Sequence, residues 1–197
     1  MNRRSILKGA TMAGFAAAVP TISLLPSASA QEEKPKSMRI QAIAQGTSTQ
    51  LGTIVNVDII IREFSTEEDR QALIAAFQAK GSQGLSRALG KMSARGRIAL
   101  TGTLGYDINF IRLIETPTGK TIRFVTDRPI RFGEAWHDTR SSDYDLSAGE
   151  IVLSGGEKDK ATGTLLPACQ FTLDKDKGLE IELRKNAWKL VNIRVSE

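Results

Sequence analysis

Short runs in which apolar and polar residues alternate make up most of the chain, and they constrain its fold more than any other feature. In the run LEIELR, at 179–184, leucine or isoleucine alternates with a charged residue. Such alternation puts apolar side chains on one face of a strand and polar side chains on the other. Pro117 and Gly119 separate two such runs and predict a hairpin. Because the turns are short, neighbouring strands are expected to pair antiparallel.

Two of the predicted strands lie on either side of the segment 65–92. In TIVNVDIIIREF, at 53–64, Ile60 is an additional apolar residue on the otherwise polar face. The run YDINFIRLIE, at 106–115, is expected to be one strand.

One region has the pattern of helices instead of strands. In STEEDRQALIAAFQAKG, Ser65 or Thr66 can cap a helix, and Ser65 with Glu68 fits a capping box. Gly81 can end this helix in the left-handed region. A second, short helix is predicted from the spacing of Leu85, Ala88, Leu89 and Met92.

These patterns predict a mainly β fold of the α+β class. The expected architecture is an antiparallel sandwich or a partly closed barrel of about nine or ten strands. A two-helix insertion is expected between the second and third strands. Residues 38–197 form a single β-rich domain, because no linker or internal repeat interrupts them. Residues 31–37, QEEKPKS, are polar and are expected to be a disordered lead-in.

Residues 1–30 have the pattern of a secretory signal peptide, with a basic start, an apolar run and an A-x-A cleavage site at Ala28 and Ala30. The start NRRSILK resembles the twin-arginine export signal, with Arg3 and Arg4 as the arginine pair. This resemblance implies export in the folded state, to the periplasm or the extracellular space. An ordinary secretory signal is the alternative. No later run is apolar enough to span a membrane once the signal is removed.

Charge and cysteine content narrow the possible partners. The chain has 27 basic and 22 acidic residues, and the signal contains three of the basic residues and none of the acids. The remaining chain is nearly neutral, so nucleic acid is not expected as a partner. Cys169 is the only cysteine, so no internal disulfide and no thiolate metal cluster can form. It lies in an apolar run, where a buried, unreactive thiol is expected.

The stretch KGSQGLSRALGKMSARGR, at 80–97, has five basic residues and no acid. It is not a phosphate-binding loop, because five residues instead of four separate Gly84 from Gly90. The charges predict either a face for an anionic envelope component or an acidic protein, or a solvated helix face. The residues of this anionic-partner face are Arg87, Lys91, Arg95 and Arg97.

The acidic segment around the only histidine is the candidate for chemistry. His137 with Glu134 and Asp138 could act in acid–base catalysis. His137 with Asp143 and Asp145 could bind a hard divalent cation. However, the spacing matches no established metal motif, and such carboxylates commonly cap turns. No motif predicts a cofactor.

The sequence therefore predicts an exported, non-enzymatic domain that binds a ligand, an envelope component or a partner. The alternative is a small envelope enzyme centred on His137 and the neighbouring carboxylates. Binding requires an apolar pocket or an exposed apolar patch away from His137, whereas catalysis requires His137 and at least two carboxylates in one cleft. An assembly module would need an uncovered edge strand or an apolar patch.

Overall fold

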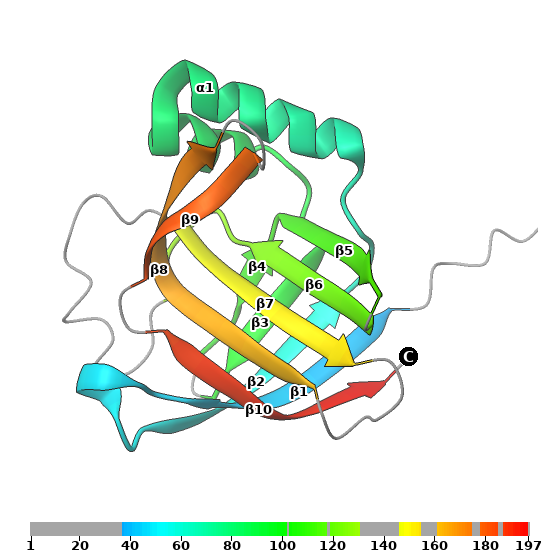
Figure 1. Cartoon of the computed structure of the whole chain (residues 1–197), viewed down its shortest axis with the longest axis vertical. Coiled ribbons are helices and arrows are strands. Elements are labelled where there is room, and N and C mark those ends of the chain that lie inside the picture. The colour runs from blue at the N-terminus through cyan, green and yellow to red at the C-terminus, as the bar shows by residue number, and fades with distance from the viewer. Residues whose placement is uncertain are drawn as a thin grey trace, which may run out of the picture. The chain divides into compact units, whose positions relative to one another are not determined.

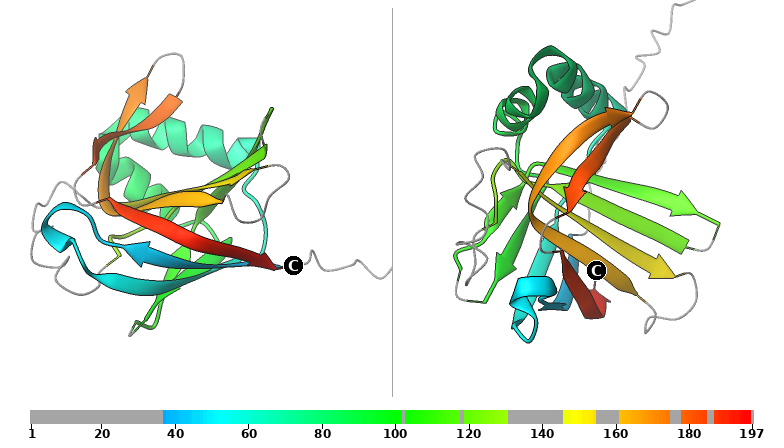
Figure 2. Two further views of the ribbon diagram at one scale, coloured as in Figure 1. Left: turned by 60° about the horizontal axis from the view of Figure 1, so that its bottom comes forward. Right: turned by 60° about the vertical axis from the view of Figure 1, so that its left-hand side comes forward.

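The structure is a computed structural model that describes residues 37–101, 103–117, 119–130, 146–154, 161–174, 178–184 and 187–196. Within these residues, ten strands form one antiparallel sheet that curls into a nearly closed barrel (Figures 1 and 2). The predicted mainly β fold is confirmed, and the architecture is the barrel, not the sandwich.

The strands in chain order are β1 (Met38–Gln45), β2 (Ile54–Ile61), β3 (Gly96–Leu100), β4 (Tyr106–Ile108), β5 (Phe110–Thr116), β6 (Gly119–Val125), β7 (Leu146–Ser154), β8 (Thr162–Asp174), β9 (Gly178–Arg184) and β10 (Trp188–Ser196). A short 3-10 helix, η1 (Ser48–Gln50), lies between β1 and β2, and helix α1 (Glu67–Leu89) lies between β2 and β3, where a helical insertion was predicted. The order across the sheet is β4-β3-β2-β1-β10-β8-β7-β6-β5, and β9 pairs with β8. Strands β4 and β5 are therefore the two edges, although they follow each other in the chain.

The barrel closes at the seam between these two edges. The sequence predicts a single strand here, but the structure divides it at Asn109, because β4 pairs with β3 and β5 pairs with β6. The Asn109 side chain is buried, and its backbone N–H donates to the Val125 carbonyl at 3.2 Å. The chain thus crosses the seam of its own barrel at this residue.

Ser65 binds the edge strand β5 from the segment that leads from β2 to α1. Its N–H donates to the Ile111 carbonyl at 2.7 Å, and its hydroxyl oxygen accepts from the Ile111 N–H at 3.0 Å. The predicted capping box of Ser65 with Glu68 is therefore wrong. Thr66 is the N-cap and Asp69 is its partner, because the Ser65 hydroxyl is already bound to β5.

Apolar side chains from strands all around the barrel fill its interior. The buried residues of this cluster include Ile40, Ile59, Ile98, Ile111, Ile122, Phe124, Ile151, Leu165, Trp188 and Leu190. They form one contiguous cluster, so the interior is a packed core. On β2, Ile60 is exposed between the buried Ile59 and Ile61, as the alternation predicted.

Helix α1 packs against the outside of the barrel, over the part of β8 that pairs with β9 (Figure 1). The predicted apolar positions Leu73, Leu85 and Leu89 are buried there, in a second cluster that includes Phe171 of β8. Burial of such a stripe is the main source of stability for a helix of this length. No helix within the described residues is long and apolar enough to cross a membrane.

The two predicted helices are the two arms of α1. The predicted break at Gly81 is present, because Lys80 and Gly81 have non-helical backbone angles and Gly81 has φ of +57°. A Cβ atom on Gly84 would lie 2.2 Å from the Ala76 carbonyl oxygen. The second arm can therefore fold this close to the first only because residue 84 has no side chain.

Gly96 allows the seam to close, and a side chain there is expected to open it. A Cβ atom at this position would lie 2.4 Å from the Ile60 carbonyl oxygen and 2.8 Å from Cδ1 of Ile111. We expect Gly96→Ala to lower the free energy of unfolding by about 3 kcal/mol, since the backbone of β2 must move. Urea denaturation followed by circular dichroism measures this change. The control is Gly90→Ala, whose nearest neighbour would be 3.5 Å away; equal effects of the two substitutions would contradict this account.

Candidate functional site

The acidic segment that contains the only histidine lies outside the described residues. All the predicted catalytic and metal-binding residues fall between Ile130 and Leu146: Glu134, His137, Asp138, Asp143 and Asp145. Their roles stay predictions. Among the residues that the structure does describe, no three histidine, cysteine, aspartate or glutamate side chains lie close enough to share a metal ion.

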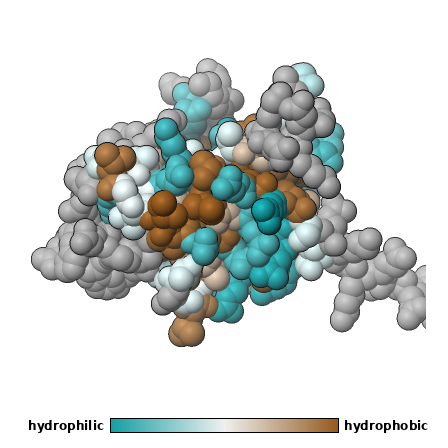
Figure 3. Space-filling model, turned by 90° about the horizontal axis from the view of Figure 1, so that it is seen from below, coloured by the Kyte–Doolittle hydropathy of each residue, from teal (hydrophilic) through white to brown (hydrophobic). Residues whose placement is uncertain are grey.

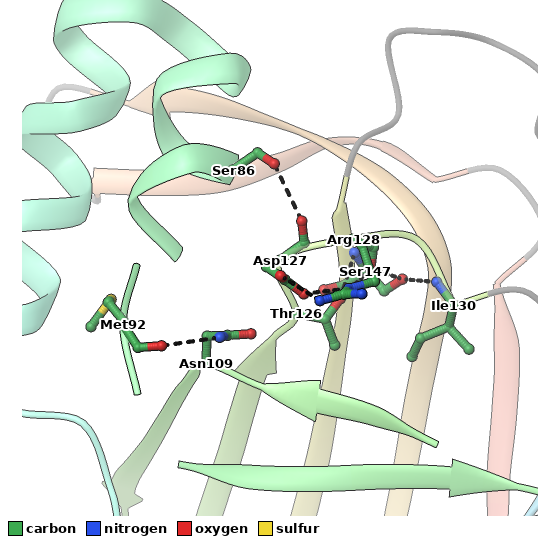
Figure 4. Close-up of polar contacts among 8 residues, drawn as sticks. All are labelled: Ser86, Met92, Asn109, Thr126, Asp127, Arg128, Ile130 and Ser147. Carbon is green, nitrogen blue, oxygen red and sulfur yellow. Dashed lines mark hydrogen bonds and ion pairs between the residues drawn. The ribbon is translucent and has the colours of Figure 1, made fainter. Parts of the chain in front are cut away.

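Two buried hydroxyl groups join the ends from which that segment leaves the barrel (Figure 4). The Ser147 N–H, on β7, donates to the Thr126 hydroxyl oxygen at 3.2 Å, and the Thr126 N–H donates to the Ser147 carbonyl at 3.0 Å. The Thr126 hydroxyl donates to the Arg128 carbonyl at 2.6 Å. We call these contacts, with those that Ser147 makes to Ile130 and Pro167, the polar clasp.

Ser147 also joins β7 to β8 at an irregular point in the sheet. Its hydroxyl oxygen accepts from the Ile130 N–H at 2.6 Å, and the hydroxyl donates to the Pro167 carbonyl at 2.5 Å. The register between β7 and β8 shifts between Leu146 and Ala148. Because proline has no N–H, the regular ladder cannot continue through residue 167. The Ile130 N–H donates to the Pro167 carbonyl at 3.0 Å, and the Ser147 hydroxyl is an additional partner of both groups.

The hydroxyls of the polar clasp are not suited to nucleophilic catalysis. A serine or threonine nucleophile needs a general base within hydrogen-bonding distance. Here the partners of Thr126 and Ser147 are backbone amides and carbonyls, which do not accept a proton at neutral pH. Both residues are buried. The polar clasp is therefore a structural joint.

The same joint connects α1 to the barrel. The Ser86 hydroxyl of α1 donates to the Asp127 carbonyl at 3.2 Å (Figure 4). Just after α1, the Met92 carbonyl accepts from Nδ2 of Asn109 at 3.4 Å. The second arm of the helix, the seam residue and the loop after β6 are thus held by one group of polar contacts.

Removing the Ser147 hydroxyl is expected to destabilise the fold. In Ser147→Ala, the Ile130 N–H and the Pro167 carbonyl keep their hydrogen bond to each other but lose their contacts to the hydroxyl, which we expect to lower the free energy of unfolding by about 1 kcal/mol. Urea denaturation measures the loss. The exposed Ser93 provides the control, because Ser93→Ala should change stability by less than about 0.5 kcal/mol. If Ser147→Ala is equally silent, the polar clasp does not hold the loop.

The four residues of the predicted anionic-partner face do not have equivalent surroundings. Arg87 in α1 and Lys91 just after it are exposed. The guanidinium of Arg95, in contrast, contacts the Glu63 carboxylate at 2.5 Å and the Asp69 carboxylate at 3.0 Å. It therefore bridges the segment before α1 and the first turn of the helix.

Arg97 also has a partner within the fold. It lies on β3, and its guanidinium donates to the Leu104 carbonyl in the turn between β3 and β4. Arg87, Lys91 and Arg97 are the members of the predicted face whose charges contact no acid among the described residues. Binding of an anionic envelope component or an acidic protein by the predicted face stays a prediction.

Cys169 is buried, as predicted. Burial raises the pKa of its thiol to about 12, because the interior disfavours the charged thiolate. The thiolate is the nucleophilic form of cysteine. At neutral pH this thiol is therefore unreactive in the folded protein.

Large exposed apolar side chains gather at one end of the barrel. Leu51 lies between β1 and β2 and is 82% exposed, and Ile54 at the start of β2 is 64% exposed. Leu104, in the turn between β3 and β4, is 91% exposed. The two loops lie at the same end, because the Thr101 N–H after β3 donates to the Asn56 carbonyl of β2 at 3.1 Å.

The outer face of β1, β2 and β10 continues this apolar surface. Ile43 pairs with Val191 on one side and with Asn56 on the other, so it lies diagonally beside Ile54. Figure 3 shows apolar side chains gathered on the face seen from below, next to a polar region. We define the apolar end as Ile43, Leu51, Ile54, Leu104 and Val191.

The opposite end of the same face is charged. The Arg39 guanidinium contacts the Asp58 carboxylate at 2.8 Å, and both side chains are partly exposed. The hydrogen bond from Arg39 lowers the pKa of the Asp58 carboxyl below its ordinary value. On β1 and β2 this face is therefore divided along the strands into an apolar half and a charged half, and Lys189 of β10, which pairs with Gln45, adds an exposed charge at the apolar end.

Both loops of the apolar end lack charged residues. They read GTSTQLGT, at 46–53, and TGTLG, at 101–105, in a chain of which 25% is charged. Charged residues are depleted from surfaces that become buried on binding, so this end has the composition of a contact surface. These residues were not predicted from the sequence, although two uncharged turns were a signal that could have found them.

Gln50 lies beneath the loop that carries Leu51. It is 4% exposed, and neither atom of its amide group forms a hydrogen bond within the described part of the chain. The loop folds tightly here: a Cβ atom on Gly46 would lie 2.2 Å from the Gln50 carbonyl oxygen, and the Thr47 hydroxyl donates to the Ala187 carbonyl. A buried amide without partners lowers stability.

Replacing the Gln50 amide with an apolar group of similar size is therefore expected to stabilise the protein. We expect Gln50→Met to raise the free energy of unfolding by about 1 kcal/mol, because no polar group then stays buried without a partner. Thermal and urea denaturation measure the change. Gln45 is exposed on β1, and Gln45→Met should leave stability unchanged. A clear loss of stability in Gln50→Met would show that the amide has a stabilising partner.

The fold and these surfaces define a class of protein: a nearly closed antiparallel β-barrel with a packed core and one helix against its outer wall. No family model, no curated protein and no solved structure matches the chain.

Proposed function

We propose that the protein is an exported, non-enzymatic module that binds a component of the cell envelope through its outer surface. The export part of the proposal rests on the signal-like start of the chain, with its paired Arg3 and Arg4.

The filled interior of the barrel is the observation that carries this proposal. A barrel that transports a small molecule holds it inside. Here side chains such as Phe124, Ile151 and Trp188 occupy the interior as part of one buried cluster. The most exposed apolar side chains lie outside, at the apolar end. An exposed apolar surface of this kind is what a binding or assembly role requires.

The groups with catalytic potential in the described residues support the same proposal. The hydroxyls of Thr126 and Ser147 are bound to the backbone, and the Cys169 thiol is protonated at neutral pH. The alternative of an envelope enzyme depends on His137 and its neighbouring carboxylates. Substitution of His137 separates the two functions.

Mass spectrometry and envelope binding test the proposal together. The full chain is expressed, and the exported protein is recovered. Its native mass spectrum is expected to give the mass of the polypeptide alone, because the described side chains of the barrel interior pack into one buried cluster. Isolated envelope membranes are expected to retain the protein and its His137→Ala variant equally in a sedimentation assay. A small molecule bound one to one would contradict surface binding, and an activity lost in His137→Ala would favour the enzyme.

A further inference from the structure

We propose that the apolar end inserts into a neutral lipid surface and is the part of the protein that contacts the membrane. This inference rests on the proposed function, because it names the surface and the chemical class of the binding partner. Three observations carry it: the exposure of the apolar side chains, the small size of the apolar surface, and the lack of charged residues in its two loops.

The side chains of the apolar end protrude instead of lining a groove. Leu51 and Leu104 lie in two separate turns, and each exposes more than four-fifths of its surface. Gly52, next to Leu51, has φ of +93°, which gives the turn its sharp tip. Protruding tips of this kind fit a soft surface, because lipid closes around an apolar side chain without a preformed complementary shape.

The apolar end is too small to form a stable protein interface by itself. It consists of five residues, whereas a specific protein interface uses roughly 20–30 residues on each side. A second copy of the chain, or a protein bound with high affinity, would therefore need a much larger contact. Lipid needs only the burial of the protruding side chains, and so it is the occupant that matches the available area.

The lack of charge in the two loops fits contact with a neutral lipid surface. The two loops carry no charged residue, and their serine and threonine residues can remain among the polar headgroups. The exposed cations Arg87 and Lys91 belong to α1 and the segment after it, and Figures 1 and 2 place α1 and the η1 loop on opposite sides of the barrel. They therefore lie away from the η1 loop. The exposed cations nearest to the apolar end are Arg97, whose guanidinium is bound to the Leu104 carbonyl, and Lys189, which pairs with Gln45.

The same arrangement sets the orientation of the barrel. The charged half of the β1–β2 face, with the Arg39–Asp58 pair, lies at the other end of the strands from Ile54. Insertion of the apolar end leaves this pair in water. The barrel therefore contacts the membrane with its apolar end and not with the side of the sheet. Contact through the side would bury the charges of Arg39 and Asp58 at a high cost.

Vesicle sedimentation tests the proposal directly. The exported protein, shown by its intact mass to lack the signal, is mixed with phosphatidylcholine vesicles and centrifuged. The protein is expected to sediment with the vesicles equally well from about 0.05 to about 0.5 M NaCl, because phosphatidylcholine carries no net charge for the exposed cations to contact. Leu51→Ser and Leu104→Ser are each expected to lower the partition coefficient about tenfold, and the double variant further.

Two exposed valines elsewhere provide matched controls. Val152 and Val195 are exposed to a similar, smaller degree, on β7 and β10, and Val152→Ser and Val195→Ser should leave the partition coefficient unchanged. Circular dichroism and urea denaturation confirm that the Leu51 and Leu104 variants stay folded. Both positions are exposed, so their stability should not change.

Several results would overturn the proposal. The protein could fail to bind phosphatidylcholine, or the two leucine variants could bind like the original protein. It could bind only vesicles that contain phosphatidylglycerol, and this binding could be abolished by salt and by the double substitution Arg87→Ala and Lys91→Ala. That result would assign binding to the cationic residues. It could also form a dimer in solution that Leu51→Ser dissociates, which would assign the surface to a second copy. If envelope membranes retain the double leucine variant fully, the inference fails while the proposed function survives.

Discussion

The closure of the barrel seam is the constraint on which the rest of the structure depends. A sheet with edges β4 and β5 must bring together two strands that are adjacent in the chain but do not pair with each other. Ser65 satisfies one edge through two hydrogen bonds to Ile111, and Gly96 gives the strands room to approach. Without this closure, the isoleucines of the interior would face water along an open edge.

The seam also fixes where α1 lies. The segment that contains Ser65 leads directly into the helix, and Arg95 binds Glu63 before the helix and Asp69 in its first turn. The distal arm is attached separately, through Ser86 and the loop after β6. One helix thus spans two fixed points on the barrel, and the break at Gly81 lets its arms reach both. Because α1 is bound at both points, it stabilises the segment before the helix and the loop after β6.

The sequence predicted the parts of this fold that arise from periodicity. Alternation identified the strands and placed Ile60 on the outer face, and helical spacing identified Leu73, Leu85 and Leu89 as the packed side of the helix. Periodicity could not locate the seam, because Asn109 interrupts a run that reads as one strand. It could not assign Ser65 or Arg95 either, since both bind residues that become neighbours only in the closed barrel. The exposed tips Leu51 and Leu104 were missed because a single leucine in a turn has no periodic signal.

Filling the interior of a barrel has a consequence for where function can reside. Each strand alternates between the core and the outer face, so a sequence that fills the core leaves only the outward positions and the turns for recognition. In this barrel the outward positions of β1 and β2 carry the Arg39–Asp58 pair at one end and Ile43 and Ile54 at the other. The turns at the second end have no charge and contribute Leu51 and Leu104. Because exposed apolar turns stabilise nothing within the fold, a contact outside the molecule is the physical reason that best accounts for them.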